Sequence, residues 1–183
     1  ASRVTRYDSR SAFGESESWE VYDTTRTHPL SKGFIGSVFA GRFVYFVPYH
    51  NGRERHGRVA RYDTRGGFAE DRSWEVFDIC QIDENSRGFF GGIFDGRYIY
   101  FTPHCKAPDL YHGQVTRYDT QGDFTSADSW RFFDTGEIHP NNKGFIGGVF
   151  DGRFVYLPPF ETEENKHSGQ TVRIDTHAPG IWE

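Results

Sequence analysis

The sequence predicts an all-β protein made of repeated four-stranded antiparallel units. Composition supports this: the chain of 183 residues has 21 Gly, 18 Phe and 10 Tyr but only three Leu and no Met. Gly favours turns, and aromatic and β-branched residues favour strands, whereas a helical core needs unbranched apolar residues. A set of motifs also recurs about every 55 residues. An all-helical fold is therefore excluded.

Four motifs recur in the same order in successive units. They are Val-x-Arg-Tyr-Asp, a Ser-Trp pair, Gly-Phe, and Phe-x-Gly-Arg-aromatic-x-Tyr. The first occurs at residues 4–8, 59–63 and 115–119, with a shorter copy at 172–175; the Trp of the second is Trp19, Trp74 and Trp130; the third starts at Gly33, Gly88 and Gly144; the fourth starts at Phe39, Phe94 and Phe150. This regularity predicts one repeat domain over residues 1–183. We expect the repeated tryptophans to pack between units, and the Arg and Asp of the first motif to form a bracing ion pair or a turn hydrogen bond in each unit.

Each unit contains four strand candidates, which the unit beginning at Gly33 illustrates. Residues 33–39 are small and apolar, and the turn containing Ala40-Gly41 predicts a hairpin to residues 42–47, where apolar residues alternate with others. Residues 58–63 and 74–78 are the third and fourth strands. Four antiparallel strands in about 55 residues are typical of a β-propeller blade.

These motifs together resemble a Kelch-type repeat of the galactose-oxidase-like β-propellers. The resemblance covers nearly the whole chain, although Val47-Pro48, Thr102-Pro103 and Leu157-Pro158 replace the Gly-Gly doublet that usually ends the second Kelch strand. It implies an all-β propeller with about three to three and a half blades in this chain. The expected divisions are a half blade at 1–32, blades at 33–87 and 88–143, and an incomplete blade at 144–183.

So few blades do not close a propeller, because propellers have about four to eight. We therefore expect a homodimer in which residues 3–23 of one copy complete the last blade of the other. In that arrangement the strand at residues 171–176 is surplus. A fragment of a longer repeat protein is the alternative.

Charge and composition limit the classes of partner that we expect for this chain. The net charge is −5, with 21 Lys and Arg scattered among 26 Asp and Glu, so we expect no nucleic-acid partner. No apolar run approaches the ~20 residues of a membrane span, so we expect no membrane partner. Two cysteines, Cys80 and Cys105, are too few for a disulfide scaffold, and two ordinary thiols are the favoured interpretation. The sequence leaves the compartment open, cytoplasmic or secreted after processing.

One face of the predicted blades carries the candidate site. Connections from fourth to first strands and from second to third strands emerge on this face and contain seven of the eight histidines. Function is concentrated on loops that a rigid scaffold holds in place. The predicted ligand-binding residues are His28, Lys32, His50, His56, Arg87, His104, His112, His139, Lys143 and His167.

Repetition separates two interpretations of these residues. His56, His112 and His167 precede the third strands, and Lys32, Arg87 and Lys143 precede the first strands. Because residues that maintain a fold recur in every unit, such repeated residues are expected to brace their own loops. Residues that differ between units are better site candidates: His50, Glu54, His104, Cys105, Asp109, Glu161, Glu163, Glu164, His28 and His139.

The favoured function is binding of a carbohydrate or another polar small molecule on this face. Aromatic rings stack on sugars, and Asp, Glu, His and Asn side chains form hydrogen bonds with them. The alternatives are a metal-assisted lyase, hydrolase or isomerase on the same face, and a protein-interaction scaffold. A bound divalent metal stays open, because imidazole and carboxylate ligands are present without a dedicated spacing.

Overall fold

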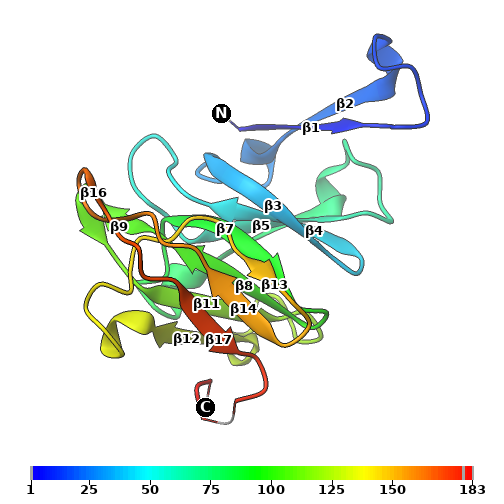
Figure 1. Cartoon of the computed structure of the whole chain (residues 1–183). Helices are drawn as coiled ribbons and strands as arrows, with labels where there is room; N and C mark the ends of the chain where they lie inside the picture. Colours follow the sequence, from blue (N-terminus) through cyan, green and yellow to red (C-terminus); the bar gives the residue numbers. More distant parts are fainter. Residues whose placement is uncertain (1, 179, 183) are drawn as a thin grey trace.

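The computed structural model describes residues 2–178 and 180–182, which form an all-β protein of antiparallel sheets with two to four strands (Figure 1). Six single-turn 3₁₀ helices lie before or after outer strands: η1 (Ser16–Ser18), η2 (Thr24–Arg26), η3 (Asp71–Ser73), η4 (Ile79–Gln81), η5 (Ala127–Ser129) and η6 (Thr135–Glu137). Among the described residues there is no α-helix, and no helix there has the length and apolar character to cross a membrane.

Sheet I contains β3 (Phe34–Ala40), β4 (Phe43–Pro48), β5 (Arg58–Asp63) and β6 (Trp74–Asp78), in that order across the sheet. The predicted third and fourth strands have the observed bounds, and the first two are shifted by one residue. Val38 pairs with Tyr45, and Tyr45 pairs with Arg61. Tyr45 is fully buried, as expected for the alternation of apolar residues along this strand.

Sheet II repeats this order with β7 (Phe89–Phe94), β8 (Tyr98–Pro103), β11 (Gln114–Asp119) and β12 (Trp130–Asp134). Sheet III has only β13 (Val149–Phe150), β14 (Phe154–Leu157) and β17 (Val172–Asp175). Before sheet I, β1 (Arg3–Tyr7) and β2 (Trp19–Asp23) form a separate hairpin. Two short hairpins extend from the loops of sheets II and III: β9 (Cys105–Ala107) with β10 (Leu110–Tyr111), and β15 (Glu161–Glu163) with β16 (Lys166–His167).

The strand that the sequence left surplus pairs within its own chain. β17 lies antiparallel to β14, with Val155 opposite Ile174. This is the edge on which residues 3–23 of a second copy were expected, so that detail of the dimer prediction is wrong. The physical reason is that the connection through residues 158–171, which contains the β15–β16 hairpin, returns the chain to the edge of β14, so this edge is covered without a partner chain.

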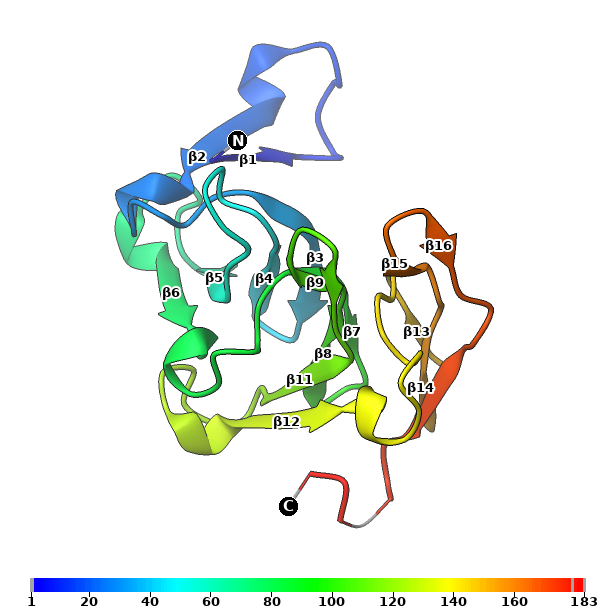
Figure 2. The same cartoon turned by 90° about the vertical axis from the view of Figure 1, so that its left-hand side faces the viewer.

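The first strands of successive sheets lie side by side, β3 against β7 and β7 against β13 (Figure 2). Glycine allows this close approach: a Cβ on Gly91 would lie 2.7 Å from the Cα of Gly147. The amide of Gly147 donates to the carbonyl of Phe90 at 2.8 Å, and the Thr102 hydroxyl donates to the carbonyl of Gly147 at 2.9 Å. Sheets II and III are therefore joined by hydrogen bonds as well as packing.

Aromatic residues fill the space between the outer parts of successive sheets. Tyr22 of β2 stacks on Trp74 of sheet I, with ring centroids 4.3 Å apart, and Phe77 of sheet I stacks on Trp130 of sheet II at 5.8 Å. The prediction that these tryptophans pack between units is thus confirmed for Trp74 and Trp130. Trp19 packs only within its own hairpin, against Tyr7 and Phe13.

For the repeated Arg and Asp of the third strands, the structure has the predicted turn hydrogen bond: the carboxylates of Asp63 and Asp119 accept from the amides of Arg65 and Gln121, both at 3.0 Å. The repeated Arg and Asp do not form the alternative ion pair with each other. Arg61 pairs with Glu75 across β5 and β6 at 2.6 Å, while Asp63 pairs with Arg42, which follows the turn between β3 and β4. Side chains alternate between the two faces of a strand, so Arg61 and Glu75, which are directly opposite, meet on one face.

Candidate functional site

Three equivalent loops carry most of the predicted site residues. They connect second to third strands and span residues 49–56, 104–112 and 159–168. Each is held at its start by a glycine: the carbonyls of Gly33, Gly88 and Gly144 accept from the amides of His50, Cys105 and Glu161 at 3.1, 3.1 and 3.0 Å. At Gly88, with φ +67°, a Cβ would lie 1.9 Å from the Cys105 carbonyl oxygen. Only glycine lets the loop approach this closely.

The loops close at equivalent positions, which corrects one predicted equivalence. The amides of His56, His112 and Ser168 donate to the carbonyls of Tyr49, His104 and Phe160 at 3.1, 3.0 and 3.2 Å. Ser168, and not His167, therefore occupies the place of His56 and His112. His167 lies one residue earlier, in the place of Arg55 and Tyr111. The loop of sheet III is longer than the other two, so its histidine falls one residue before the position of His56 and His112.

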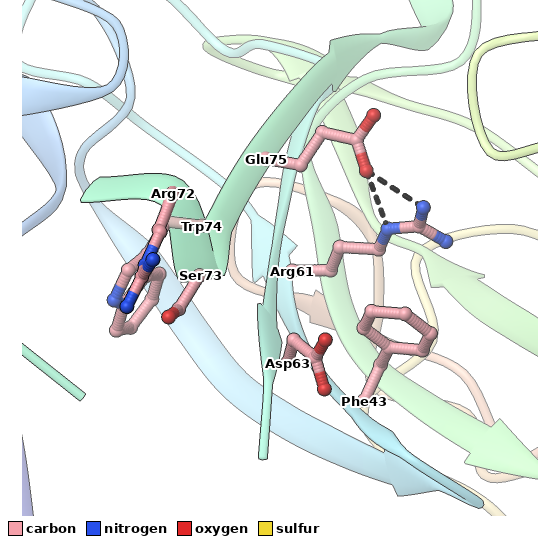
Figure 3. Close-up of a pocket in the computed structure, with 7 residues that line it drawn as sticks. All are labelled: Phe43, Arg61, Asp63, Arg72, Ser73, Trp74 and Glu75. Carbon is pink, nitrogen blue, oxygen red and sulfur yellow. Dashed lines mark hydrogen bonds and ion pairs between the residues drawn. The ribbon is translucent and has the colours of Figure 1, made fainter. Parts of the chain in front are cut away.

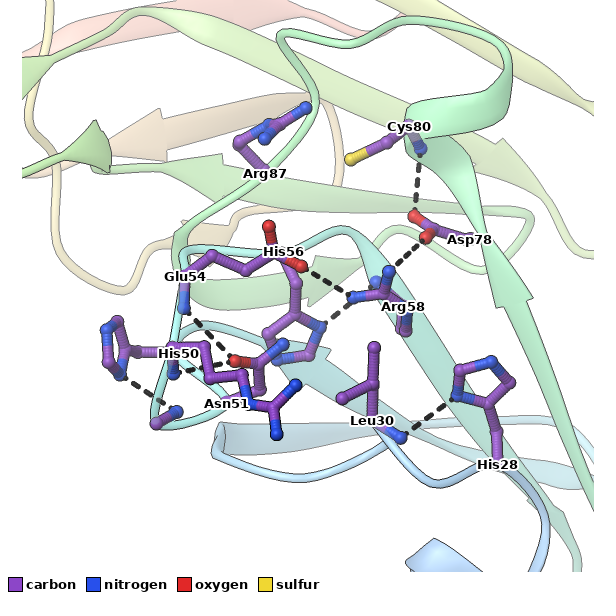
Figure 4. Close-up of polar contacts among 12 residues, drawn as sticks. His28, Leu30, His50, Asn51, Glu54, His56, Arg58, Asp78, Cys80 and Arg87 are labelled. Atoms are coloured by element: carbon purple, nitrogen blue, oxygen red, sulfur yellow. Dashed lines mark hydrogen bonds and ion pairs between the residues drawn. The ribbon is translucent and has the colours of Figure 1, made fainter.

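Most of the predicted histidines brace their own loops. In five of them, Nδ1 accepts a hydrogen bond from the backbone N–H two residues later, at 3.1 to 3.3 Å (Figure 4). These are His28, His50, His56, His112 and His139. The imidazole acts here as an Asp or Asn side chain does in a local turn. Bracing was expected for the repeated His56 and His112; for His28, His50 and His139, which vary between units, the interpretation as site residues loses support.

Burial fixes the charge state of the two repeated braces. Burial lowers the pKa of His56 from its usual 6.5 to about 4 and that of His112 to about 3. The Nε2 of His112 lies 2.9 Å from the carbonyl oxygen of Arg87. Around His56 the backbone of Lys32 is the corresponding group, but no hydrogen bond of ordinary geometry forms there. Both imidazoles are therefore neutral at pH 7.

His104 differs from these braces and lies among aromatic rings. Its centroid is 4.7 Å from Phe90, 5.3 Å from Tyr111, 5.9 Å from Phe160 and 6.2 Å from Tyr49. His104 is buried, and the four rings around it are partly exposed. We call these five residues the aromatic row. Tyr49, His104 and Phe160 are the equivalent residues of the three loops. The row therefore forms where these three loops lie next to one another.

Polar groups surround the aromatic row. The Arg55 guanidinium lies 3.9 Å from the centre of the Tyr49 ring, a cation–π geometry. The Tyr111 hydroxyl donates to Glu161 Oε2 at 2.6 Å. Nδ1 of His104 and Nε of Arg55 are both buried without a hydrogen-bond partner among the described residues. Such atoms are uncommon in folded proteins and cost roughly 1–3 kcal/mol each.

Burial also controls ionisation within the row. It lowers the pKa of His104 below its ordinary value, against the opposing effect of the Glu161 charge. Burial raises the pKa of the neighbouring Cys105 thiol. The imidazole and the thiol are therefore both neutral near pH 7, and the charges at this place come from Arg55 and Glu161.

The thiols and the candidate metal ligands form no joint site in the part of the chain that the structure describes. Cys80 and Cys105 are free cysteines, and burial raises the pKa of Cys80 to about 12. Among residues 2–178 and 180–182 no group of three or more His, Cys, Asp or Glu side chains is placed to hold a metal ion.

Of the three repeated cations that precede the first strands, only Arg87 lines the cleft to which His50 also contributes. Neither Lys32 nor Lys143 lines that cleft. The Arg87 Nε donates to the carbonyl of Glu84 at 2.7 Å, which fixes its side chain beside that cleft.

A second kind of concavity is repeated elsewhere, on the outer strands. One pocket of about 270 Å³ has Arg61, Glu75 and Trp74 in its wall (Figure 3). A matching pocket of about 280 Å³ contains Arg117 and Trp182. Arg61 is already paired with Glu75 and lies 4.3 Å from the rings of both Phe43 and Phe124. We therefore interpret these pockets as gaps beside scaffold residues.

Sequence reasoning identified His104 and Glu161 as varying residues but missed Arg55 and Phe90. Phe90 follows a repeated Gly-Phe pair, where the other units have Ile35 and Ile146. Arg55 stands directly before a repeated histidine, in the place of Tyr111. In both cases the sequence signal was that the residue differs from the equivalent residues of the other units.

No family model matches the chain. A search of curated proteins also finds no match.

Proposed function

We propose that this chain is a ligand-binding module that holds a carbohydrate or another polar small molecule at the aromatic row. The observation that carries the proposal is the convergence of three loops on His104, which places the partly exposed rings of Tyr49, Phe90 and Phe160 around one imidazole. Binding sites of this kind are largely apolar, with few polar groups that fix orientation.

The chemistry of the row suits a sugar ring. Aromatic faces offer apolar contact to the C–H faces of a pyranose, and Arg55 and Glu161 offer a donor and an acceptor for hydroxyl groups. The site is asymmetric, since each loop contributes a different side chain at the same position. One site per chain is therefore expected, rather than equivalent sites in successive sheets.

We also propose that the sheets are blades of a Kelch-like propeller and that a second copy supplies further blades. Side-by-side first strands and tryptophans stacked between sheets support this arrangement. Phe13 and Val21 of the N-terminal hairpin are 69% and 52% exposed, although the equivalent Phe68 is buried by Arg6 and its neighbours. A second copy would cover the two residues. Native mass spectrometry tests this: a species of twice 21.1 kDa supports the dimer and a monomer contradicts it.

Saturation-transfer NMR tests the binding proposal. The probes are glucose, galactose, mannose and their uronic acids, with the intact chain and the variants Phe160→Ala and His104→Ala. We expect at least one sugar to bind and both variants to lose it. Phe39→Ala is the matched control, because it removes a 60% exposed aromatic ring that lies outside both the row and the N-terminal hairpin. Binding that survives both row variants, or no binding by any probe, would overturn the proposal.

A further inference from the structure

A cleft of about 250 Å³ adjoins the aromatic row, between residues 50–55 and 106–108. Its polar lining consists of His50, Arg53, Glu54, Arg55, Arg87 and Lys106. Arg55 connects the two features, since it lines the cleft and its guanidinium lies over the Tyr49 ring of the row. The cleft and the row are therefore contiguous and can contact one ligand.

Charge in this cleft is unbalanced. Arg53, Arg55, Arg87 and Lys106 form no ion pair with any carboxylate in the described part of the chain, whereas many other arginines do. The only acid in the lining, Glu54, is 3.3 Å from Arg58, as Figure 4 shows, and so is partly occupied. Four unpaired cations around one cleft are unexpected in a chain whose net charge is −5.

Neutral partners hold some of these cations in place without cancelling their charge. The Lys106 ammonium donates to Asn85 Oδ1 at 2.8 Å, and the Arg87 Nε donates to the Glu84 carbonyl. Their remaining N–H groups are available to a ligand. Guanidinium groups form paired hydrogen bonds with carboxylates and phosphates, and these bonds are stronger than those between neutral groups.

We propose that the cleft binds the oxyanion of an acidic sugar whose ring lies on the aromatic row. This inference rests on the proposed function and specifies its ligand class. The shared chemistry is a carboxylate or phosphate ester on a pyranose. The positive cleft also attracts such a ligand over a distance set by the ionic strength.

Isothermal titration calorimetry with three probes tests the inference: glucuronate, glucose 6-phosphate and glucose. We expect at least one acidic probe to bind about tenfold or more tightly than glucose, with affinity that falls as salt rises. The cleft variant Arg53→Gln/Lys106→Gln should lose this preference. Its matched control is Arg10→Gln/Arg72→Gln, which removes the same charge at side chains that are 89% and 84% exposed and lie on other loops.

Each result separates the two proposals. Tighter binding of one acidic probe that is lost in the cleft variant and kept in the control supports the inference and shows whether carboxylate or phosphate is preferred. Equal binding of all three probes overturns the inference and leaves the proposed function standing. Inorganic phosphate that binds as tightly as glucose 6-phosphate, with no effect of Phe160→Ala, also overturns it, because the sugar ring then contributes nothing. If no probe binds, both proposals fail.

Discussion

The two ends of the loop 104–112 use histidine in opposite ways. At its closing end, His112 is buried, accepts a backbone hydrogen bond at Nδ1, and faces the Arg87 carbonyl with Nε2. At its starting end, His104 is equally buried but leaves Nδ1 without a partner among the described residues. The closing end repeats at His56, and the starting end does not repeat. Nδ1 is thus satisfied by the backbone in the repeated histidines His56 and His112, and it lacks a partner in His104, where the units differ.

The strongest test of the frame is the glycine at the start of the loop. Gly88→Ala should lower the free energy of unfolding by more than ~3 kcal/mol, because φ is +67° and the new Cβ would lie 1.9 Å from a backbone oxygen. Urea denaturation monitored by Trp fluorescence measures the loss. Gly169→Ala is the control, since no atom lies within 4 Å of its Cβ position. Equal, small losses in both variants would show that the loops are not anchored in this way.

The two histidines can be compared directly by substitution. His112→Ala should cost about 2–3 kcal/mol of unfolding free energy, because it creates a cavity and removes a partner from the Gln114 amide. His104→Phe should cost less than about 1 kcal/mol, because it removes an unpartnered nitrogen and keeps an aromatic ring. Ligand binding should depend on the row and not on the brace, so it should be lost in His104→Ala and kept in His112→Ala. A larger stability loss in His104→Phe than in His112→Ala would reverse the comparison.

The buried braces also predict a pH dependence. His56 and His112 have pKa values lowered to about 4 and about 3 in the folded chain. An unfolded chain with ordinary pKa values near 6.5 therefore binds more protons than the folded chain when the pH lies below 6.5. The contribution of these histidines to the free energy of unfolding should therefore be fully present above pH 6.5. It should fall as the pH drops towards 4, by on the order of 2–3 kcal/mol per histidine. Urea midpoints at several pH values measure the fall.

A double variant isolates this titration. His56→Asn/His112→Asn keeps a side-chain acceptor near the Arg58 and Gln114 amides but does not titrate. Its stability should depend less on pH between 6.5 and 4 than that of the unchanged chain. If the two slopes are the same, other groups cause the acid sensitivity.

Much of the fold followed from the sequence because it depends on local and repeated properties. Strand bounds in sheet I were predicted to within one residue, since alternation and Gly turns act within each unit. The role of Trp74 and Trp130 was also predicted. The last unit was also predicted to be an incomplete blade whose third strand is at residues 172–175, and β17 pairs with β14 accordingly. The two-chain arrangement nevertheless left this strand surplus. The turn hydrogen bonds of the repeated Asp residues followed from the sequence. The ion-pair partners of the repeated Arg residues did not, because cross-strand register decides them, as Arg61 and Glu75 illustrate.

The site was predictable only in part. Difference between units selected His104, which lies in the proposed site, but it also selected His28, His50 and His139, which brace their own turns. The row depends on contacts between side chains of three loops, and no spacing within one loop reveals such contacts. Arg55 illustrates this limit, because its contact with the Tyr49 ring and its place in the cleft exist only once the loop has folded.

The smallest predicted effect separates burial from hydrogen-bond geometry. His139 accepts from the Asn141 amide at 3.2 Å, as His112 does from Gln114 at 3.3 Å, but His139 is exposed. His139→Ala should therefore change the unfolding free energy by no more than about 0.5 kcal/mol, because water can satisfy the freed amide. Sugar binding should not change, since His139 lies outside the row. A loss as large as that of His112→Ala would mean that the local hydrogen bond, and not burial, determines how much such a histidine contributes to the free energy of unfolding.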